Sequence, residues 1–184
     1  GLIRLMRAGA DVPPWFVLPA GADPQKALAA WSELGWGRVA VRSSAMAEDG
    51  AVHSFAGMYE SILGVAHGEG LLNAIARCRE SAENPRVAAY LAENGLATSP
   101  VAVIVQQLVE GEASGVLFSS DPSDPDRALI SAAWGLGEGV VQGTVPCDTF
   151  RVERNGSIES VLGHKDLAIS MVDGAPAEVP VPPS

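Results

Sequence analysis

The chain has 184 residues, 47% of them hydrophobic and 18% charged, which is enough apolar material for a folded core and excludes disorder over most of the length. Its net charge of −10 argues against binding to nucleic acid, and no apolar run approaches the ~20 residues that cross a membrane. Two cysteines, Cys78 and Cys147, provide neither a disulfide framework nor a metal-binding spacing, so a reducing, cytoplasmic setting is the default expectation.

Helices are predicted mainly in the first half of the chain. Pro24–Leu34 has apolar residues at helical spacing, begins with a proline suited to a first turn and is followed by Gly35, which ends helices. Residues 70–82 and 86–93 show the same spacing, and Pro85 separates them. Short strands are expected at 39–41 and 58–65.

The second half reads as strands. Asn155–Gly156 is a hairpin signal between two of them. The predicted strands are 101–109, 114–119, 127–132, 149–153 and 157–162. Early helices followed by paired strands favour an α+β fold over regular alternation.

Both ends read as interior to a longer protein. Leu2–Arg7 resembles the second half of a helix, and residues 175–184 are rich in proline. Such a segment favours extended, semi-rigid geometry, so we expect a linker to a further domain; a frayed tail is the alternative.

Three segments contain candidate functional residues. The first segment lies at the end of the predicted strand 39–41. Arg42 has a planar guanidinium that can grip a phosphate through two hydrogen bonds, and Ser43 and Ser44 add hydroxyl and backbone donors. The alternative is a structural ion pair between Arg42 and Glu48 or Asp49.

The second segment is the glycine-dense loop Gly135–Gly139. Glycines allow a backbone to approach a phosphate closely, and Glu138 offers a carboxylate to Mg²⁺. The loop matches neither the dinucleotide-binding fingerprint nor a Walker loop. A tight turn between strands is the alternative.

The third segment is the apolar run 101–109. Its walls could clamp an adenine ring while main-chain groups read the edge of the ring; the alternative is an ordinary core strand. The three histidines are too scattered for a zinc site.

Taken in order, these segments resemble the N-terminal ATP-binding domain, of the ATP-grasp fold, of the phosphoenolpyruvate synthase and pyruvate phosphate dikinase family, which includes rifampin phosphotransferases. The motifs that carry the resemblance are collinear. They are Ala8–Val17, Val41–Ala45, Ser54–Ser61, Val105–Val109, Ser114–Phe118, Asp121–Pro122, Trp134–Glu138, Val141–Gly143 and Asp148.

The resemblance implies an ATP-grasp domain over residues 1–174, with a first part at 1–99, a second at 100–174 and the linker at 175–184. Such a domain binds ATP with Mg²⁺ and phosphorylates a histidine on a separate swivelling domain. That histidine then passes the phosphoryl group to a small acceptor on a third domain. The sequence does not say whether the acceptor is pyruvate, an antibiotic or another molecule.

The resemblance also implies roles for individual residues. Arg42 and Ser43 would hold the ATP phosphates, and the loop around Gly57 would close over them. Glu138 and Gln142 would lie at the Mg²⁺ end, with Arg42 and Glu138 as the catalytic residues. The predicted adenine slot consists of Gln107, Leu108 and Val109.

Two departures from the family keep a second interpretation open. The phosphate-binding lysine of relatives lies upstream of Leu2, outside this sequence, and Ser131 stands where relatives usually carry an acid. These departures favour a degenerate nucleotide-binding or interaction module that has lost turnover.

Overall fold

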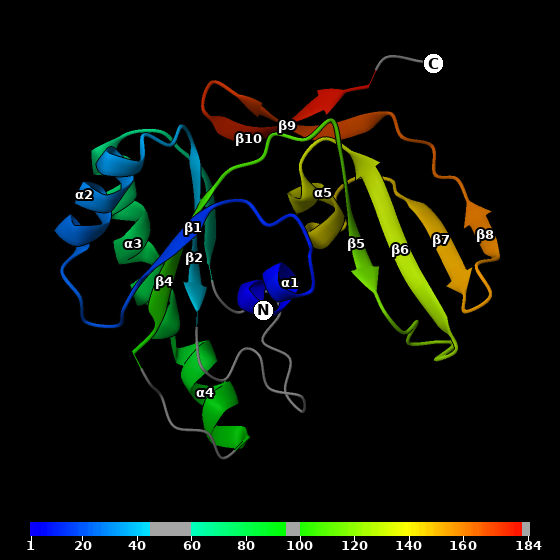
Figure 1. Ribbon diagram of the computed structural model, residues 1–184, viewed down its shortest axis with the longest axis horizontal. Helices are drawn as coiled ribbons and strands as arrows, with labels where there is room; N and C mark the ends of the chain where they lie inside the picture. The colour runs from blue at the N-terminus through cyan, green and yellow to red at the C-terminus, as the bar shows by residue number, and fades with distance from the viewer. Residues whose placement is uncertain (45–59, 95–99, 182–184) are drawn as a thin grey trace. The chain divides into compact units, whose positions relative to one another are not determined.

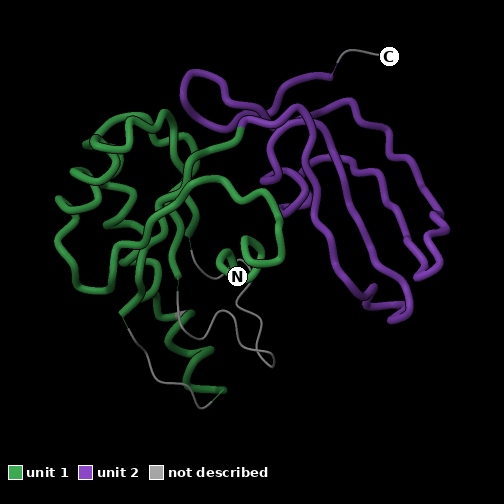
Figure 2. Tube along the Cα trace, in the orientation of Figure 1, with its two compact units in different colours: residues 1–109 green, residues 110–184 purple. Residues whose placement is uncertain are grey.

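The computed structural model describes residues 1–44, 60–94 and 100–181, and the chain divides into two compact units, Gly1–Val109 and Glu110–Ser184 (Figure 2). Helices occur together with antiparallel sheets, which confirms the predicted α+β, ATP-grasp-like fold class. Within the described residues, no helix has the length and apolar character needed to cross a membrane.

The first unit is built on a four-stranded sheet with the order β1-β4-β2-β3 and antiparallel neighbours throughout (Figure 1). Helices α2 and α3 pack on one face of this sheet. The strands are β1 (Trp15–Leu18), β2 (Val39–Ser44), β3 (Ser61–Val65) and β4 (Ala102–Gln107), and the helices are α1 (Leu2–Arg7), α2 (Pro24–Leu34), α3 (Gly68–Ala82) and α4 (Pro85–Glu93).

Pro24 and Gly35 act as predicted at the two ends of α2, and Asp23 adds an N-terminal cap that was not predicted. The Asp23 side chain accepts a hydrogen bond from the backbone N–H of Gln25 at 3.0 Å, Pro24 occupies the first turn, and Gly35 closes the helix with a left-handed φ of 62°. Helix α3 begins two residues earlier than predicted. His67 caps it, because its Nδ1 accepts from the N–H of Gly70.

The core of the first unit lies between the helices and one face of the sheet. Alternate residues of β2 and β4 point into it and are fully buried, while α3 contributes the side chains that cover them. These residues are Val39, Val41, Val103, Val105, Leu71, Ile75 and Cys78. Burial of each aliphatic side chain contributes about 1.5–3 kcal/mol to stability relative to exposure. The apolar residues therefore determine which face of the sheet packs against the helices, and the residues that alternate with them lie on the opposite face.

The boundary between the two compact units follows Val109, later in the chain than the predicted division at residues 99 and 100. Strand β4 comes after that point, yet it pairs with β1 on one side and β2 on the other, and the first unit therefore extends to Val109. The reason is topological: β4 fills the centre of the sheet, and the pairing partners of a central strand cannot be read from its own apolar sequence.

The second unit contains a four-stranded antiparallel sheet with the order β5-β6-β7-β8 (Figure 1). The predicted hairpin at Asn155–Gly156 is confirmed: it joins β7 to β8, and Gly156 takes a φ of 89°. The strands are β5 (Ala113–Phe118), β6 (Arg127–Trp134), β7 (Asp148–Glu153) and β8 (Ile158–Val161), and the short helix α5 (Gly137–Gln142) follows β6.

Residues 175–180, which the sequence predicts as part of a linker, are in a strand. These residues form β10 (Ala175–Pro180), which pairs along its whole length with β9 (Leu167–Val172), a strand that the sequence reading did not identify. An edge strand tolerates proline, because an N–H that faces away from the partner strand is not needed. The missed signal is Asp173–Gly174, whose φ values of 50° and 86° are those of a two-residue hairpin turn.

Candidate functional site

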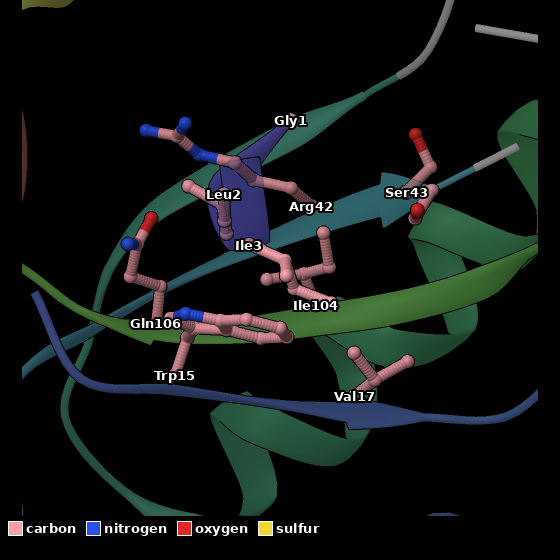
Figure 3. Close-up of a pocket in the computed structure, with 10 residues that line it drawn as sticks. Gly1, Leu2, Ile3, Trp15, Val17, Arg42, Ser43, Ile104 and Gln106 are labelled. Atoms are coloured by element: carbon pink, nitrogen blue, oxygen red, sulfur yellow. The ribbon is translucent and has the colours of Figure 1, made fainter. Parts of the chain in front are cut away.

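A pocket of about 370 Å³ lies on the face of the first unit's sheet that α2 and α3 leave uncovered (Figure 3). Its size is in the range of small-molecule sites. The pocket is lined by Gly1, Leu2, Ile3, Trp15, Val17, Arg42, Ser43, Ser44, Ile104 and Gln106.

Strand register explains why these side chains share one face. Side chains directly opposite each other in neighbouring strands point to the same side of a sheet. One row across β1, β4 and β2 contains Trp15, Gln106 and Ala40, and the next row contains Val17, Ile104 and Arg42. The pocket floor is therefore aromatic and amide in one row, and aliphatic and cationic in the next.

Arg42 is the charged side chain of this floor. It is exposed, whereas Val41 and Ser43 on either side of it are buried, because alternation along β2 turns it to the pocket face. Within the described part of the chain the Arg42 guanidinium has neither an ion-pair nor a hydrogen-bond partner. An unpaired, permanently charged planar cation beside a pocket is suited to binding phosphate.

The other predicted phosphate contacts are placed differently. Ser43 borders the pocket, but only 7% of it is exposed, because its strand position alternates to the helix-covered face. The possible ion-pair partners Glu48 and Asp49 lie outside the described residues, and so does Gly57.

The predicted adenine slot does not line this pocket. The N–H of Gln107 donates to the carbonyl of Pro14, and the N–H of Leu108 donates to the carbonyl of Arg38, each at 2.9 Å. Val109 is 60% exposed at the end of the unit. The structure brings the preceding residue, Gln106, to the pocket instead.

In the second unit, α5 places Glu138 and Gln142 side by side. The Gln142 amide Nε2 donates to Glu138 Oε1 at 2.8 Å, as expected for residues one helical turn apart. Glu138 Oε2 is buried and has no hydrogen-bond partner in the part of the chain that the structure describes, and the same is true of Ser114 Oγ on β5, which contacts the same helix. A buried carboxylate oxygen left without a partner is costly, and a cation would satisfy it.

This pair fits Mg²⁺ when phosphates supply further ligands. Mg²⁺ is commonly held by one or two carboxylates together with substrate phosphates and water. The described residues contain no group of three or more histidine, cysteine or acidic side chains arranged to hold a metal. Ser131, which lies in β6 opposite Val116 and Thr149, adds no carboxylate. Glu138 is accordingly the single acidic candidate on α5.

The glycines around Glu138 have a packing role. A Cβ atom on Gly135 would lie 2.1 Å from the Ile169 carbonyl oxygen, and one on Gly139 would lie 2.8 Å from the Ile169 side chain. The N–H of Leu136 donates to that same Ile169 carbonyl at 2.7 Å. The loop is therefore fixed against β9, which positions α5 and Glu138.

Lys165 forms an ion pair with Asp148. Its ammonium contacts Asp148, whose Oδ1 also accepts the N–H of Gly163 at 2.9 Å. The hydrogen bond from Lys165, with that from Gly163, lowers the pKa of the Asp148 carboxyl despite partial burial. This geometry favours a structural role for Lys165.

Comparison with known proteins identifies relatives over most of the chain. Residues 25–184 match the family model described as the pyruvate phosphate dikinase AMP/ATP-binding domain. The chain is 40% identical over 150 residues to a probable phosphoenolpyruvate synthase of Methanothermobacter thermautotrophicus, covering 79% of this chain and 22% of that protein.

Two further relatives are named for different activities. A rifampicin phosphotransferase of Bacillus cereus is 40% identical over 134 residues, 71% of this chain and 15% of the relative. The prodigiosin synthesizing transferase PigC of Serratia marcescens is 40% identical over 141 residues, 74% of this chain and 16% of the relative. The chain thus spans between 15% and 22% of the length of these three relatives.

Proposed function

Because the chain belongs to the pyruvate phosphate dikinase AMP/ATP-binding domain family, we propose that it binds Mg-ATP as the nucleotide-binding part of a dikinase-type phosphotransferase. It donates a phosphoryl group to a histidine on a separate swivelling domain. That histidine delivers the group to pyruvate or another small acceptor held by a third domain. The relatives named above support a phosphotransferase, and their different names leave the acceptor open.

The observation that carries the proposal is Arg42, which has no partner among the described residues and lies on the floor of a pocket that is otherwise largely apolar. A guanidinium there attracts the anionic phosphates while the apolar surface accepts the rest of the nucleotide. Transfer of a phosphoryl group depends mainly on positioning and on neutralisation of charge, and a cation on a strand of the sheet contributes to both.

Glu138 and Gln142 are the residues we assign to Mg²⁺. Gln142 donates to one carboxylate oxygen of Glu138, and the other oxygen has no partner among residues 1–44, 60–94 and 100–181. When bound, the metal neutralises phosphate charge. Glu138 is fixed in place by the close contact of the Gly135–Gly139 loop with Ile169.

Calorimetric titration with ATP in the presence of Mg²⁺ tests the site. Arg42→Ala should weaken binding about 10-fold to 150-fold, because a hydrogen bond to a charged group contributes about 1.5–3 kcal/mol. Arg154→Ala is the matched control, since Arg154 is 84% exposed and lies 3.9 Å from its acidic partner. Equal affinities for Arg42→Ala and the parent protein would return Arg42 to a structural role.

A second titration addresses the metal. Glu138→Gln keeps the size of the side chain and removes its charge, so the dependence of ATP affinity on Mg²⁺ concentration should become shallower. Superimposable Mg²⁺ titrations for the variant and the parent would remove Glu138 from the metal site.

A degenerate nucleotide-binding module is the second candidate, and Ser131 in place of the family's usual acid favours it. The distinguishing experiment supplies the chain with a histidine-bearing domain and ATP labelled in its phosphates. Acid-labile label on the histidine domain supports the phosphotransferase; saturable ATP binding without any transfer supports the module.

A further inference from the structure

We propose that Trp15 and Gln106 form the base-binding half of the pocket, with Trp15 stacking on the purine ring and Gln106 Oε1 accepting a hydrogen bond from its exocyclic amine. The proposal rests on the proposed function, namely that the pocket takes a nucleotide whose phosphates meet Arg42. It assigns the base to residues outside the predicted adenine slot.

The proposed base and phosphate contacts lie on neighbouring rows of the pocket floor. Trp15 and Gln106 are directly opposite each other in β1 and β4, and Ile104 and Arg42 are directly opposite each other in β4 and β2. The two rows are two residues apart, which is about 7 Å along a strand. An aromatic base on one row and a phosphate on the other are thus separated by a distance that a ribose spans.

The row that contains Trp15 has the shape and polarity of a site for a flat, apolar group. The indole of Trp15 is half-buried, and Val17 and Ile104 lie beside it on the same face (Figure 3). Aliphatic side chains around an exposed aromatic surface favour a flat, apolar ligand group over a sugar or a phosphate. Every nucleobase offers such a face, and stacking on an aromatic side chain is a general mode of base binding.

The orientation of the Gln106 amide leaves its oxygen as a hydrogen-bond acceptor. Its Nε2 donates to the Pro13 carbonyl at 3.2 Å, and a carbonyl can only accept, so the amide cannot be turned the other way. Gln106 Oε1 therefore remains as an acceptor, and no hydrogen bond to it is found among the described residues. An acceptor at this point favours a base with an amino group, such as adenine, over one with a carbonyl there, such as hypoxanthine.

The test compares three ligands on the full chain by calorimetry in the presence of Mg²⁺: ATP, inosine triphosphate and inorganic tripolyphosphate. The parent should bind inosine triphosphate about 5-fold more weakly than ATP, the size of one net hydrogen bond. Trp15→Ala should weaken ATP binding about 5-fold to 150-fold, the range for loss of one stacked base, and leave tripolyphosphate affinity unchanged.

Two further variants serve as controls for Trp15→Ala. Trp15→Phe keeps an aromatic face and should retain ATP binding close to that of the parent. Trp134→Ala removes a tryptophan that is 44% exposed in the second unit and should leave all three affinities unchanged. Thermal unfolding by circular dichroism identifies any variant that has lost its fold.

The outcomes separate this inference from the function on which it rests. If Arg42→Ala loses ATP and tripolyphosphate while Trp15→Ala binds ATP like the parent, the base lies elsewhere and only the Trp15 assignment is overturned. Equal affinity for ATP and inosine triphosphate overturns the role of Gln106. If the folded parent binds neither ATP nor tripolyphosphate, the nucleotide site itself is refuted, and the base assignment with it.

Discussion

Replacing Gly135 by alanine tests whether the glycine-dense loop is a device for close packing. Gly135 has a left-handed φ of 80°, and a Cβ atom there would lie 2.1 Å from the carbonyl oxygen of Ile169. That oxygen accepts the N–H of Leu136 at 2.7 Å, so it cannot move away without breaking a hydrogen bond. Alanine must therefore strain the backbone and also separate the loop from β9.

The magnitude follows from these two effects. A non-glycine residue in left-handed conformation costs about 1–2 kcal/mol, and forcing an atom into a packed contact costs about 1–3 kcal/mol more. Gly135→Ala should lower the free energy of unfolding by about 2–5 kcal/mol. Gly143→Ala isolates the first effect, since Gly143 has a φ of 67° and nothing within 4 Å of the added Cβ.

Urea unfolding followed by circular dichroism measures both variants under the same conditions. We expect the midpoint of Gly135→Ala to fall well below that of Gly143→Ala, which should itself fall slightly below the parent. Equal midpoints for the two variants would mean that the contact with Ile169 adds nothing, and the packing explanation of the loop would be refuted.

Two further predictions concern titratable groups. Hydrogen bonds from Ser123, and one from Arg151, lower the pKa of the Asp121 carboxyl, so the contribution of this carboxylate to stability is complete at neutral pH and is lost as the pH falls below about 4. In urea titrations, Ser123→Ala should therefore lose less stability than the parent between neutral pH and about pH 3. An equal loss of stability in the variant and the parent would contradict this. Burial raises the pKa of the Cys78 thiol to about 12, so a thiol reagent should label Cys147 in the native protein and react with Cys78 only after unfolding. Rapid labelling of Cys78 in the native protein would show that the core around Cys78 opens.

Local signals in the sequence determined the helices and hairpins whose ends depend on single residues. Pro24 and Gly35 act on neighbouring backbone groups, so the limits of α2 could be predicted without knowledge of its partners. The same holds for Gly156 in the hairpin between β7 and β8. Asp173–Gly174 carried an equally local signal for β9 and β10, but the prolines that follow suggested a linker.

The arrangement of the site depended on pairing between distant segments. The sequence predicted Arg42 as a phosphate ligand from its residue type and from the expected end of a strand at residue 41, whereas β2 continues to Ser44 and holds Arg42 inside the strand. Only tertiary structure placed Gln106, and not Gln107, on the same face as Arg42, since a shift of one residue turns a strand side chain to the opposite side of the sheet.

The chain's own residues thus determine the fold class, the family and the presence of an arginine suited to binding phosphate, because composition, turn residues and collinear motifs are properties of short segments. Tertiary structure decided where the first unit ends, that 175–180 pair with β9, and that Trp15 and Arg42 share a pocket floor. Each of these depends on strand register, which is fixed by burial of one sheet face against helices or by the partner strand.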